Sequence, residues 1–267
     1  MITARSSFVA RVSCWLIAAL IAGTAACASG QKRPPSGAPE PDKFLFESGN
    51  EALSGRKWLT SREYFREIVD NYPQSTYRAN AKLGVGDSYL GENTLEAKVL
   101  AINEFREFLA FYPTHPRADY AQYKLGMAHY GQMLAPERDQ SETKDAITAF
   151  EAFLELYPNS QYLADVRAKL REAKDRLAQS EYRVGLFYFR SKWYPGAIDR
   201  FKVLLDRDPE FTNRDAVYFY LAESLIKVSR PAEALPYYER LLAEFEKSVH
   251  LEEAKRRIAE LKPGHAN

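Results

Sequence analysis

The sequence of 267 residues predicts an all-α protein built as a short array of helix pairs. From Asp42 onward, long amphipathic segments follow one another, separated by short breaks that mostly contain proline. No segment alternates apolar and polar residues as a half-buried strand does. The same residue types also recur at fixed distances before the prolines. We therefore expect a right-handed superhelix of about five helix pairs, followed by a terminal capping helix.

The breaks contain four prolines that share one pattern of preceding residues. A phenylalanine stands eight residues before each proline, a small residue twelve before and an apolar residue five before. Residues three, four and seven apart lie on one face of a helix, so each set predicts a second helix that packs against a partner. The sets are Ser61, Phe65, Ile68 and Pro73; Ala101, Phe105, Phe108 and Pro113; Ala146, Phe150, Phe153 and Pro158; and Ala197, Phe201, Leu204 and Pro209. A fifth set is Ala234, Tyr238 and Leu241, with Glu246 in place of proline.

A glycine or an alanine marks the expected first helix of each pair. Gly49, Gly185 and Ala222 stand twelve residues before the small residue of the following second helix, and Gly84 and Gly126 correspond to them with longer loops. A small residue at this place lets a neighbouring helix approach closely. Together these spacings resemble the tetratricopeptide repeat.

The distances between successive prolines are 40, 45 and 51 residues, longer than the repeat length of about 34. We place the extra residues in a loop at 133–143 and in a charged segment at 159–179. This segment is expected to form one long helix, or a helix pair with a bend near Ala178. A further helix start is predicted at Thr212, because an acid, Asp215, follows it by three residues as in a capping box.

The composition excludes several functional classes. Lys plus Arg number 37 and Asp plus Glu 36, without the basic excess that is typical of a nucleic-acid-binding surface. The four histidines, at positions 115, 129, 250 and 265, show no metal-ligand spacing, and no nucleotide-binding or hydrolase motif occurs. We therefore expect no enzyme activity, no metal, no cofactor and no nucleic-acid partner.

The first 26 residues resemble a bacterial lipoprotein signal peptide. A basic segment with Arg5 and Arg11 precedes an apolar run that is too short to cross a membrane, and small residues stand directly before Cys27. Once residues 1–26 are removed, Cys27 is the one cysteine left, which favours acylation over an internal disulfide. An ordinary secretory signal with an incidental Cys27 is the alternative.

The lipid expected on Cys27 is a diacylglycerol with an additional N-acyl chain. The next residue is Ala28 instead of Asp, which resembles the signal for sorting to the outer membrane. Residues 27–41 contain four prolines and predict an extended tether. The expected location is therefore the periplasmic face of the outer membrane, with the protein anchored by lipid.

Two copies of the motif Tyr-Pro-x-Ser-x-Tyr, at 72–77 and 157–162, flank a related segment that begins Tyr112-Pro-Thr-His-Pro. In this order, after a lipoprotein signal and with a long inserted helix, the motifs resemble the BamD family, lipoproteins of the β-barrel assembly machinery. The resemblance covers residues 42–250. It implies a non-catalytic scaffold that binds the periplasmic domains of the barrel insertase, accompanies other lipoproteins of the complex and helps to deliver unfolded outer-membrane proteins.

The same resemblance implies a peptide-receiving groove in residues 42–113 and an insertase-binding half in residues 114–262, with a tail at 263–267. Aromatic residues are candidates for gripping the aromatic C-terminal end of a substrate, and basic residues for binding its carboxylate. The aromatic candidates are Phe46, Tyr89, Tyr120 and Tyr123, and the basic candidates are Arg78, Lys82 and Lys124. Arg200 is the candidate on the side that the resemblance assigns to the insertase.

Each candidate also has a structural interpretation. The alternatives are packing of the rings between neighbouring helices, a solvated face for the basic residues, and an ion pair with Asp199 or neighbouring glutamates for Arg200. Two other functions remain open for the chain as a whole. One is a periplasmic scaffold lipoprotein that serves the cell envelope or division, and the other is a carrier or inhibitor of secreted enzymes.

Overall fold

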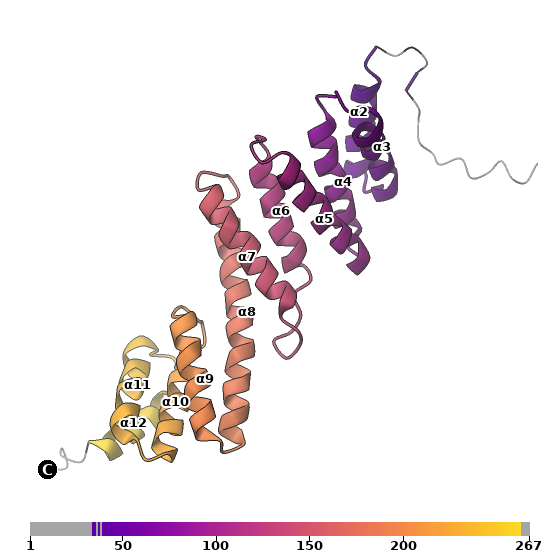
Figure 1. Cartoon of the computed structure of the whole chain (residues 1–267). Helices are drawn as coiled ribbons and strands as arrows, with labels where there is room; N and C mark the ends of the chain where they lie inside the picture. The colour runs from indigo at the N-terminus through magenta and orange to yellow at the C-terminus, as the bar shows by residue number, and fades with distance from the viewer. Residues whose placement is uncertain (1–33, 36, 38, 263–267) are drawn as a thin grey trace, which may run out of the picture. The chain divides into compact units, whose positions relative to one another are not determined.

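The computed structural model describes residues 34–35, 37 and 39–262. The predicted signal peptide 1–26, the lipidation site Cys27 and the tail 263–267 lie outside these residues. Within the described ranges the structure contains eleven helices, α2 to α12, and no strand, which confirms the all-α prediction (Figure 1). None of the described helices combines the length and the apolar character that a membrane crossing requires.

The chain divides into two compact units between Glu92 and Asn93. The first unit contains α2 (Pro41–Ser54), α3 (Trp58–Asn71) and α4 (Arg78–Glu92). The second contains α5 (Leu95–Phe111), α6 (Ala118–Tyr130), α7 (Ser141–Leu156), α8 (Leu163–Arg190), α9 (Tyr194–Arg207), α10 (Arg214–Lys227), α11 (Pro231–Glu244) and α12 (Leu251–Leu261). The functional boundary expected at residue 113 falls within the second unit, after α5, and stays a prediction.

In the first unit, a buried phenylalanine ring packs against glycines of two neighbouring helices. The ring of Phe65 on α3 lies between Gly49 on α2 and Gly84 on α4. A Cβ atom added at Gly49 would stand 2.7 Å from a ring carbon, and one added at Gly84 would stand 2.4 Å away. Both distances are far inside van der Waals contact, so only glycine allows the helices to come this close to the ring.

The second unit repeats this contact. A Cβ atom at Gly126 on α6 would stand 2.4 Å from the ring of Phe150 on α7, and one at Gly185 on α8 would stand 2.5 Å from the ring of Phe201 on α9. The recurring aromatic residues of the second helices have no exposed surface; they are Phe65, Phe105, Phe150, Phe201 and Tyr238. The predicted tetratricopeptide-like register is therefore confirmed.

Helix α8 is one continuous helix of 28 residues, as in the first of the two alternatives for this segment. It begins at Leu163, later than the expected residue 159, because the preceding loop forms a turn. In that turn the hydroxyl of Ser160 accepts a hydrogen bond from the backbone N–H of Tyr162 at 3.2 Å. The loop between α6 and α7 ends at Gln140, earlier than expected, since α7 begins at Ser141.

A serine–aspartate hydrogen bond joins the end of a helix pair to its beginning at three places in the described chain. In each case a serine hydroxyl of the loop after the second helix donates to an aspartate in the first turn of the first helix. The pairs are Ser75–Asp42, Ser160–Asp119 and Ser248–Asp215, each 2.6 Å between oxygens. Each serine also accepts the backbone N–H two residues ahead, so it fixes the loop as well as the helix.

The capping role predicted for Thr212 is wrong. Helix α10 begins at Arg214, its cap residue is Asn213, and no side chain caps its first turn. Thr212 instead donates its backbone N–H and its hydroxyl to Asp175 of α8, at 3.0 and 2.8 Å. Partners distant in sequence thus replace the local capping box at this helix start.

Replacing Gly126 by alanine is expected to lower the free energy of unfolding by about 1–3 kcal/mol, because the new Cβ would overlap the ring of Phe150. Elsewhere inside a helix the same change stabilises by up to about 1 kcal/mol, so the sign of the effect identifies the overlap. Urea unfolding followed by circular dichroism measures it. In the double variant with Phe150→Leu the overlap is relieved, so its loss should be smaller than the sum of the two single losses. Additive losses would contradict the contact.

Candidate functional site

Three equivalent aromatic stacks lie on the first helices of the array. In each stack a ring on the first helix of a pair packs against the ring that follows the second helix of the same pair. The stacks are Phe46–Tyr77, with ring centroids 5.0 Å apart and planes inclined by 25°, Tyr123–Tyr162 at 4.7 Å and 5°, and Phe219–His250 at 4.3 Å and 10°. All six rings are half-buried, so each stack keeps part of its surface open to a ligand.

The serine–aspartate hydrogen bonds position these stacks. The first ring of each stack stands four residues after the aspartate, on the same helix face, and the second ring stands two residues after the serine. In the second unit, for example, Asp119 is followed by Tyr123, and Ser160 is followed by Tyr162. The Tyr-Pro-x-Ser-x-Tyr motif therefore contains one bonding residue and one stacking residue.

The structure brings three of the predicted candidates together on α6. The ring of Tyr120 lies 5.8 Å from that of Tyr162, while Arg117 and Lys124 stand over the Tyr120 ring at 4.4 and 5.3 Å. The Tyr123 hydroxyl donates to Asp165 of α8 at 2.8 Å. Burial is the main cause that raises the pKa of Tyr123 to about 12, and this hydrogen bond is the second cause. The hydroxyl therefore remains a proton donor at neutral pH.

The candidates of the first unit are placed in packing contacts. Tyr89 is 8% exposed, Arg62 lies over its ring at 4.2 Å, and Arg66 donates to its hydroxyl at 2.8 Å. Arg78 donates its Nε to the carbonyl of Val69 at 3.0 Å, at the end of α3. Lys82 is also buried, and it interacts with other residues of the chain. A role of these residues in binding a substrate stays a prediction.

Arg200 lies apart from the other candidates, exposed on α9. Within the described chain it forms no ion pair with Asp199 or a glutamate, which was its alternative interpretation, and no side-chain hydrogen bond. Its guanidinium group is therefore open to a carboxylate of a partner.

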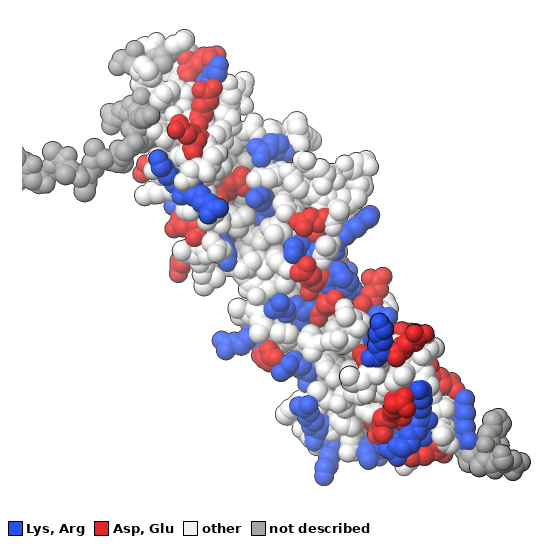
Figure 2. Space-filling model, turned by 180° about the vertical axis from the view of Figure 1, so that it is seen from behind, with Lys and Arg blue, Asp and Glu red and all other residues white. Residues whose placement is uncertain are grey.

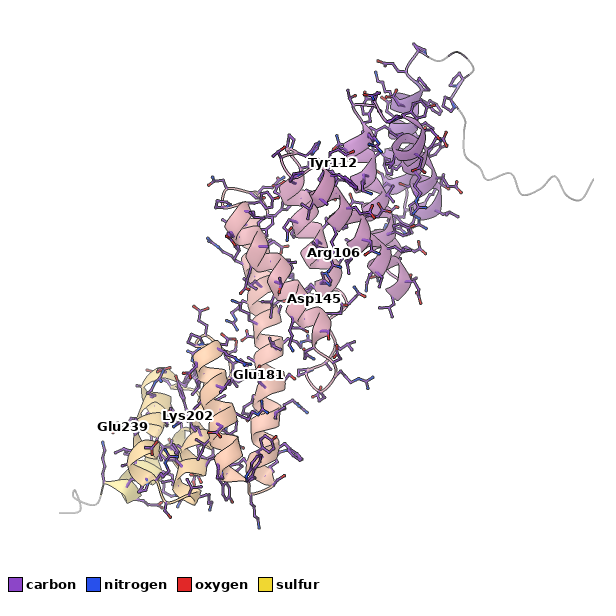
Figure 3. All side chains as sticks on the ribbon, viewed as in Figure 1. Arg106, Tyr112, Asp145, Glu181, Lys202 and Glu239 are labelled. Carbon is purple, nitrogen blue, oxygen red and sulfur yellow. The ribbon has the colours of Figure 1, made fainter. Side chains whose placement is uncertain are left out.

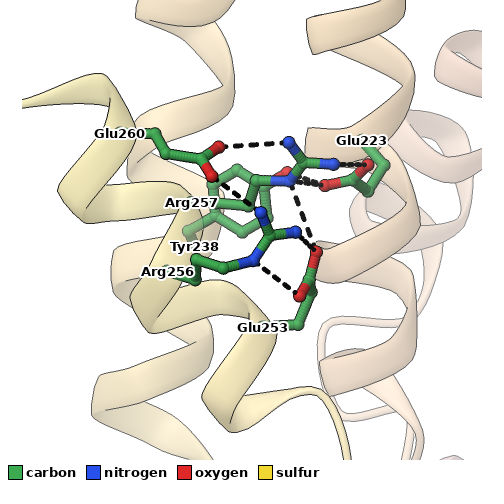
Figure 4. Close-up of polar contacts among 6 residues, drawn as sticks. All are labelled: Glu223, Tyr238, Glu253, Arg256, Arg257 and Glu260. Carbon is green, nitrogen blue, oxygen red and sulfur yellow. Dashed lines mark hydrogen bonds and ion pairs between the residues drawn. The ribbon is translucent and has the colours of Figure 1, made fainter.

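A buried carboxylate that sequence reasoning missed holds the terminal helix (Figure 4). Glu223 on α10 is 6% exposed and accepts hydrogen bonds from the Tyr238 hydroxyl at 2.5 Å and from Arg257 Nε and Nη2 at 2.8 and 3.0 Å. Burial and the bond to Glu223 raise the pKa of Tyr238. Because Arg257 belongs to α12, this paired charge fixes the capping helix on α10 and α11.

The buried His129 joins three helices. Arg106 on α5 donates to its Nε2 at 3.2 Å, and its Nδ1 lies 2.7 Å from Glu142 on α7, with Asp145 close by (Arg106 and Asp145 are labelled in Figure 3). A guanidinium group only donates, so Nε2 must accept and Nδ1 must carry the hydrogen. In this arrangement the cluster forms a polar bridge between helices.

Replacing Arg257 by methionine is expected to destabilise the docking of α12 by roughly 2 kcal/mol, because it leaves the Glu223 carboxylate buried with only one partner. Hydrogen exchange of the α12 backbone should become much faster, which mass spectrometry measures. The matched control is Arg256→Met, since Arg256 pairs with Glu253 and Glu260 at the surface and should change exchange little. Equal effects of the two variants would refute the role of Glu223.

Comparison with known proteins shows which family the chain resembles. A family model described as YfiO, outer membrane lipoprotein, matches residues 39–232. The outer membrane protein assembly factor BamD of Caulobacter vibrioides is 30% identical over 221 residues, which are 82% of this chain and 70% of the relative. The BamD proteins of Vibrio cholerae and Rickettsia prowazekii are 27% and 25% identical, over 64% and 83% of this chain and 73% and 87% of the relatives. Because these matches span most of the helical body, the chain belongs to the YfiO family of outer membrane lipoproteins and is a relative of the assembly factors BamD.

Proposed function

We propose that the chain is an assembly factor for outer-membrane proteins that acts as a non-catalytic scaffold. The observation that carries the proposal is the similarity to assembly factors named BamD along most of the described body. The fold supports the proposed scaffold role, because stacked helix pairs offer extended surfaces for other polypeptides. Figure 2 shows acidic and basic side chains interspersed on the face drawn, as suits protein partners better than nucleic acid.

The proposed partners are the periplasmic domains of the barrel insertase, other lipoproteins of the assembly complex and unfolded outer-membrane proteins. We assign substrate peptides to residues 42–113, where the stack of Phe46 and Tyr77 offers an aromatic surface. We assign the insertase to residues 114–262, where Arg200 is exposed and the rings of Tyr120 and Tyr123 are grouped.

We further propose that the protein is held at the periplasmic face of the outer membrane by a diacylglycerol and an N-acyl chain on Cys27. Stable attachment by acyl chains requires more than one chain, which this modification supplies. Residues 27–41 would then act as a spacer between the lipid headgroups and α2.

The proposal predicts that the barrel insertase co-purifies with the intact protein from detergent-solubilised outer membranes. The exposed Arg200 allows a sharper test, since Arg200→Glu should reduce the recovered insertase by about tenfold without changing the melting temperature. Arg167→Glu, an exposed position on the first half of α8, is the matched control and should retain the insertase. Absence of the insertase from the unmodified sample, measured by mass spectrometry, would refute the proposed function.

Replacing Cys27 by alanine is expected to release the protein into the soluble periplasm, because no acyl chain would remain to hold it. Fractionation of cells followed by immunoblotting measures the distribution. Mass spectrometry of the unaltered protein should show the lipid mass on the N-terminal cysteine. Retention of the Cys27→Ala variant in the membrane fraction would contradict the lipid anchor.

A further inference from the structure

The long helix α8 takes part in two helix pairs. Its first half supplies Val166 and Leu170 to a buried cluster with Phe150 and Phe153 of α7. Its second half packs on α9, where Gly185 meets the ring of Phe201. In a regular array each first helix is covered on one side by its own second helix and on the other side by the second helix of the preceding pair. The second half of α8 departs from that rule.

Helix α7 covers only the first half of α8. The two helices are consecutive and joined by a short loop, so the first residue of α7, Ser141, lies level with the middle of α8. The loop before Ser141 confirms this level, because Arg176 donates to the carbonyl of Leu134 at 2.8 Å and Arg183 pairs with Glu137 at 2.7 Å. In Figure 1 the second half of α8 extends past α7, with α9 beside it.

A strip that combines apolar and basic side chains lies on this uncovered half. Phe187 is 64% exposed and belongs to neither of the two buried clusters described for the second unit. A pocket of about 280 Å³ runs along the strip, and its lining residues are three and four apart. We call them the α8 strip: Gln179, Tyr182, Arg183, Leu186, Phe187 and Arg190.

The two charged residues of the α8 strip are basic, and the acidic residue within its span, Glu181, pairs with Arg207 at 2.9 Å. No acidic residue occurs from 182 to 198, whereas Arg183, Arg190 and Lys192 are basic. Arg190 forms no ion pair within the described chain, and the pair of Arg183 with Glu137 is about half exposed on both sides, so an incoming carboxylate can exchange for it. A partner with apolar side chains between carboxylates would fill the pocket with the apolar groups and pair its carboxylates with the basic residues.

We propose that the α8 strip binds an amphipathic helix of a partner polypeptide, which presents apolar side chains flanked by Asp or Glu. The strip spans residues 179–190, about 17 Å of helix, which matches about three turns of a partner. Arg183 and Phe187 stand five helical turns after Asp165 and Lys169, which contact tyrosines of α6. The strip therefore continues a side of α8 on which a helix packs, so a helix is the shape that fits. This inference rests on the proposed function, since it requires that the protein acts by holding polypeptides.

The test places the photoreactive residue p-benzoylphenylalanine at Phe187 in the full-length protein, in native membranes. The matched control carries the same residue at Leu156, which is 61% exposed at the end of α7. We expect a light-dependent adduct from position 187 alone, with the cross-linked peptide mapping to a helical segment that has carboxylates around apolar residues. Adding Arg183→Glu and Arg190→Glu should reduce this adduct by about tenfold.

Four outcomes would overturn the inference: no adduct at position 187, an adduct of equal yield at Leu156, an adduct with phospholipid or a second copy of the chain, or an adduct that is insensitive to the two charge reversals. An unchanged melting temperature checks that the variants fold. Co-purification of the insertase separates this result from the proposed function. If the insertase is recovered and position 187 gives no adduct, only the inference about the α8 strip fails.

Discussion

The contact between a phenylalanine ring and the glycine of a neighbouring helix is the constraint on which the rest of the structure depends. With no Cβ atom in the way, the ring of Phe65 is held between α2 and α4, and the rings of Phe150 and Phe201 sit against α6 and α8 in the same manner. The ring fixes both the distance between helices and their register along the chain. Because that register is set at one level of each pair, the ends of the helices remain free to vary in length.

The serine–aspartate hydrogen bonds lie at these helix ends, whose lengths vary between pairs. Each serine–aspartate bond closes the loop at one end of a pair, and the ring two residues after the serine then stacks on the first helix. Loop geometry and aromatic surface are thus set by one short motif, which explains why stacks of similar geometry recur far apart in the sequence. The copy at α10 and α11 ends in His250 instead of tyrosine, and Glu223 of α10 adds an ion pair with Arg257 of α12.

The parts of this architecture that depend on local spacing could be predicted from the sequence. The phenylalanine and proline intervals placed the second helices, and the buried Phe105 and Tyr238 confirm them. Contacts between residues more than thirty positions apart could not be predicted. Asp175 takes the hydrogen bonds of Thr212, Arg257 finds Glu223, and Tyr162 stacks on Tyr123, although nothing near these residues in sequence indicates the partner. Binding roles for Tyr89, Arg78 and Lys82 stay predictions.

A repeat array offers to partners the surfaces that its own packing leaves open, so irregular places matter more than regular ones. In a regular pair the apolar face of each helix is buried against the neighbouring helices. Where α8 continues beyond α7, this cover ends. Val184 stands five turns after the buried Val166 and is 40% exposed, and Phe187 is 64% exposed. Lengthening one helix therefore creates a surface without altering the buried rings on either side. The cost in stability is small, because the Phe150 and Phe201 contacts belong to separate clusters.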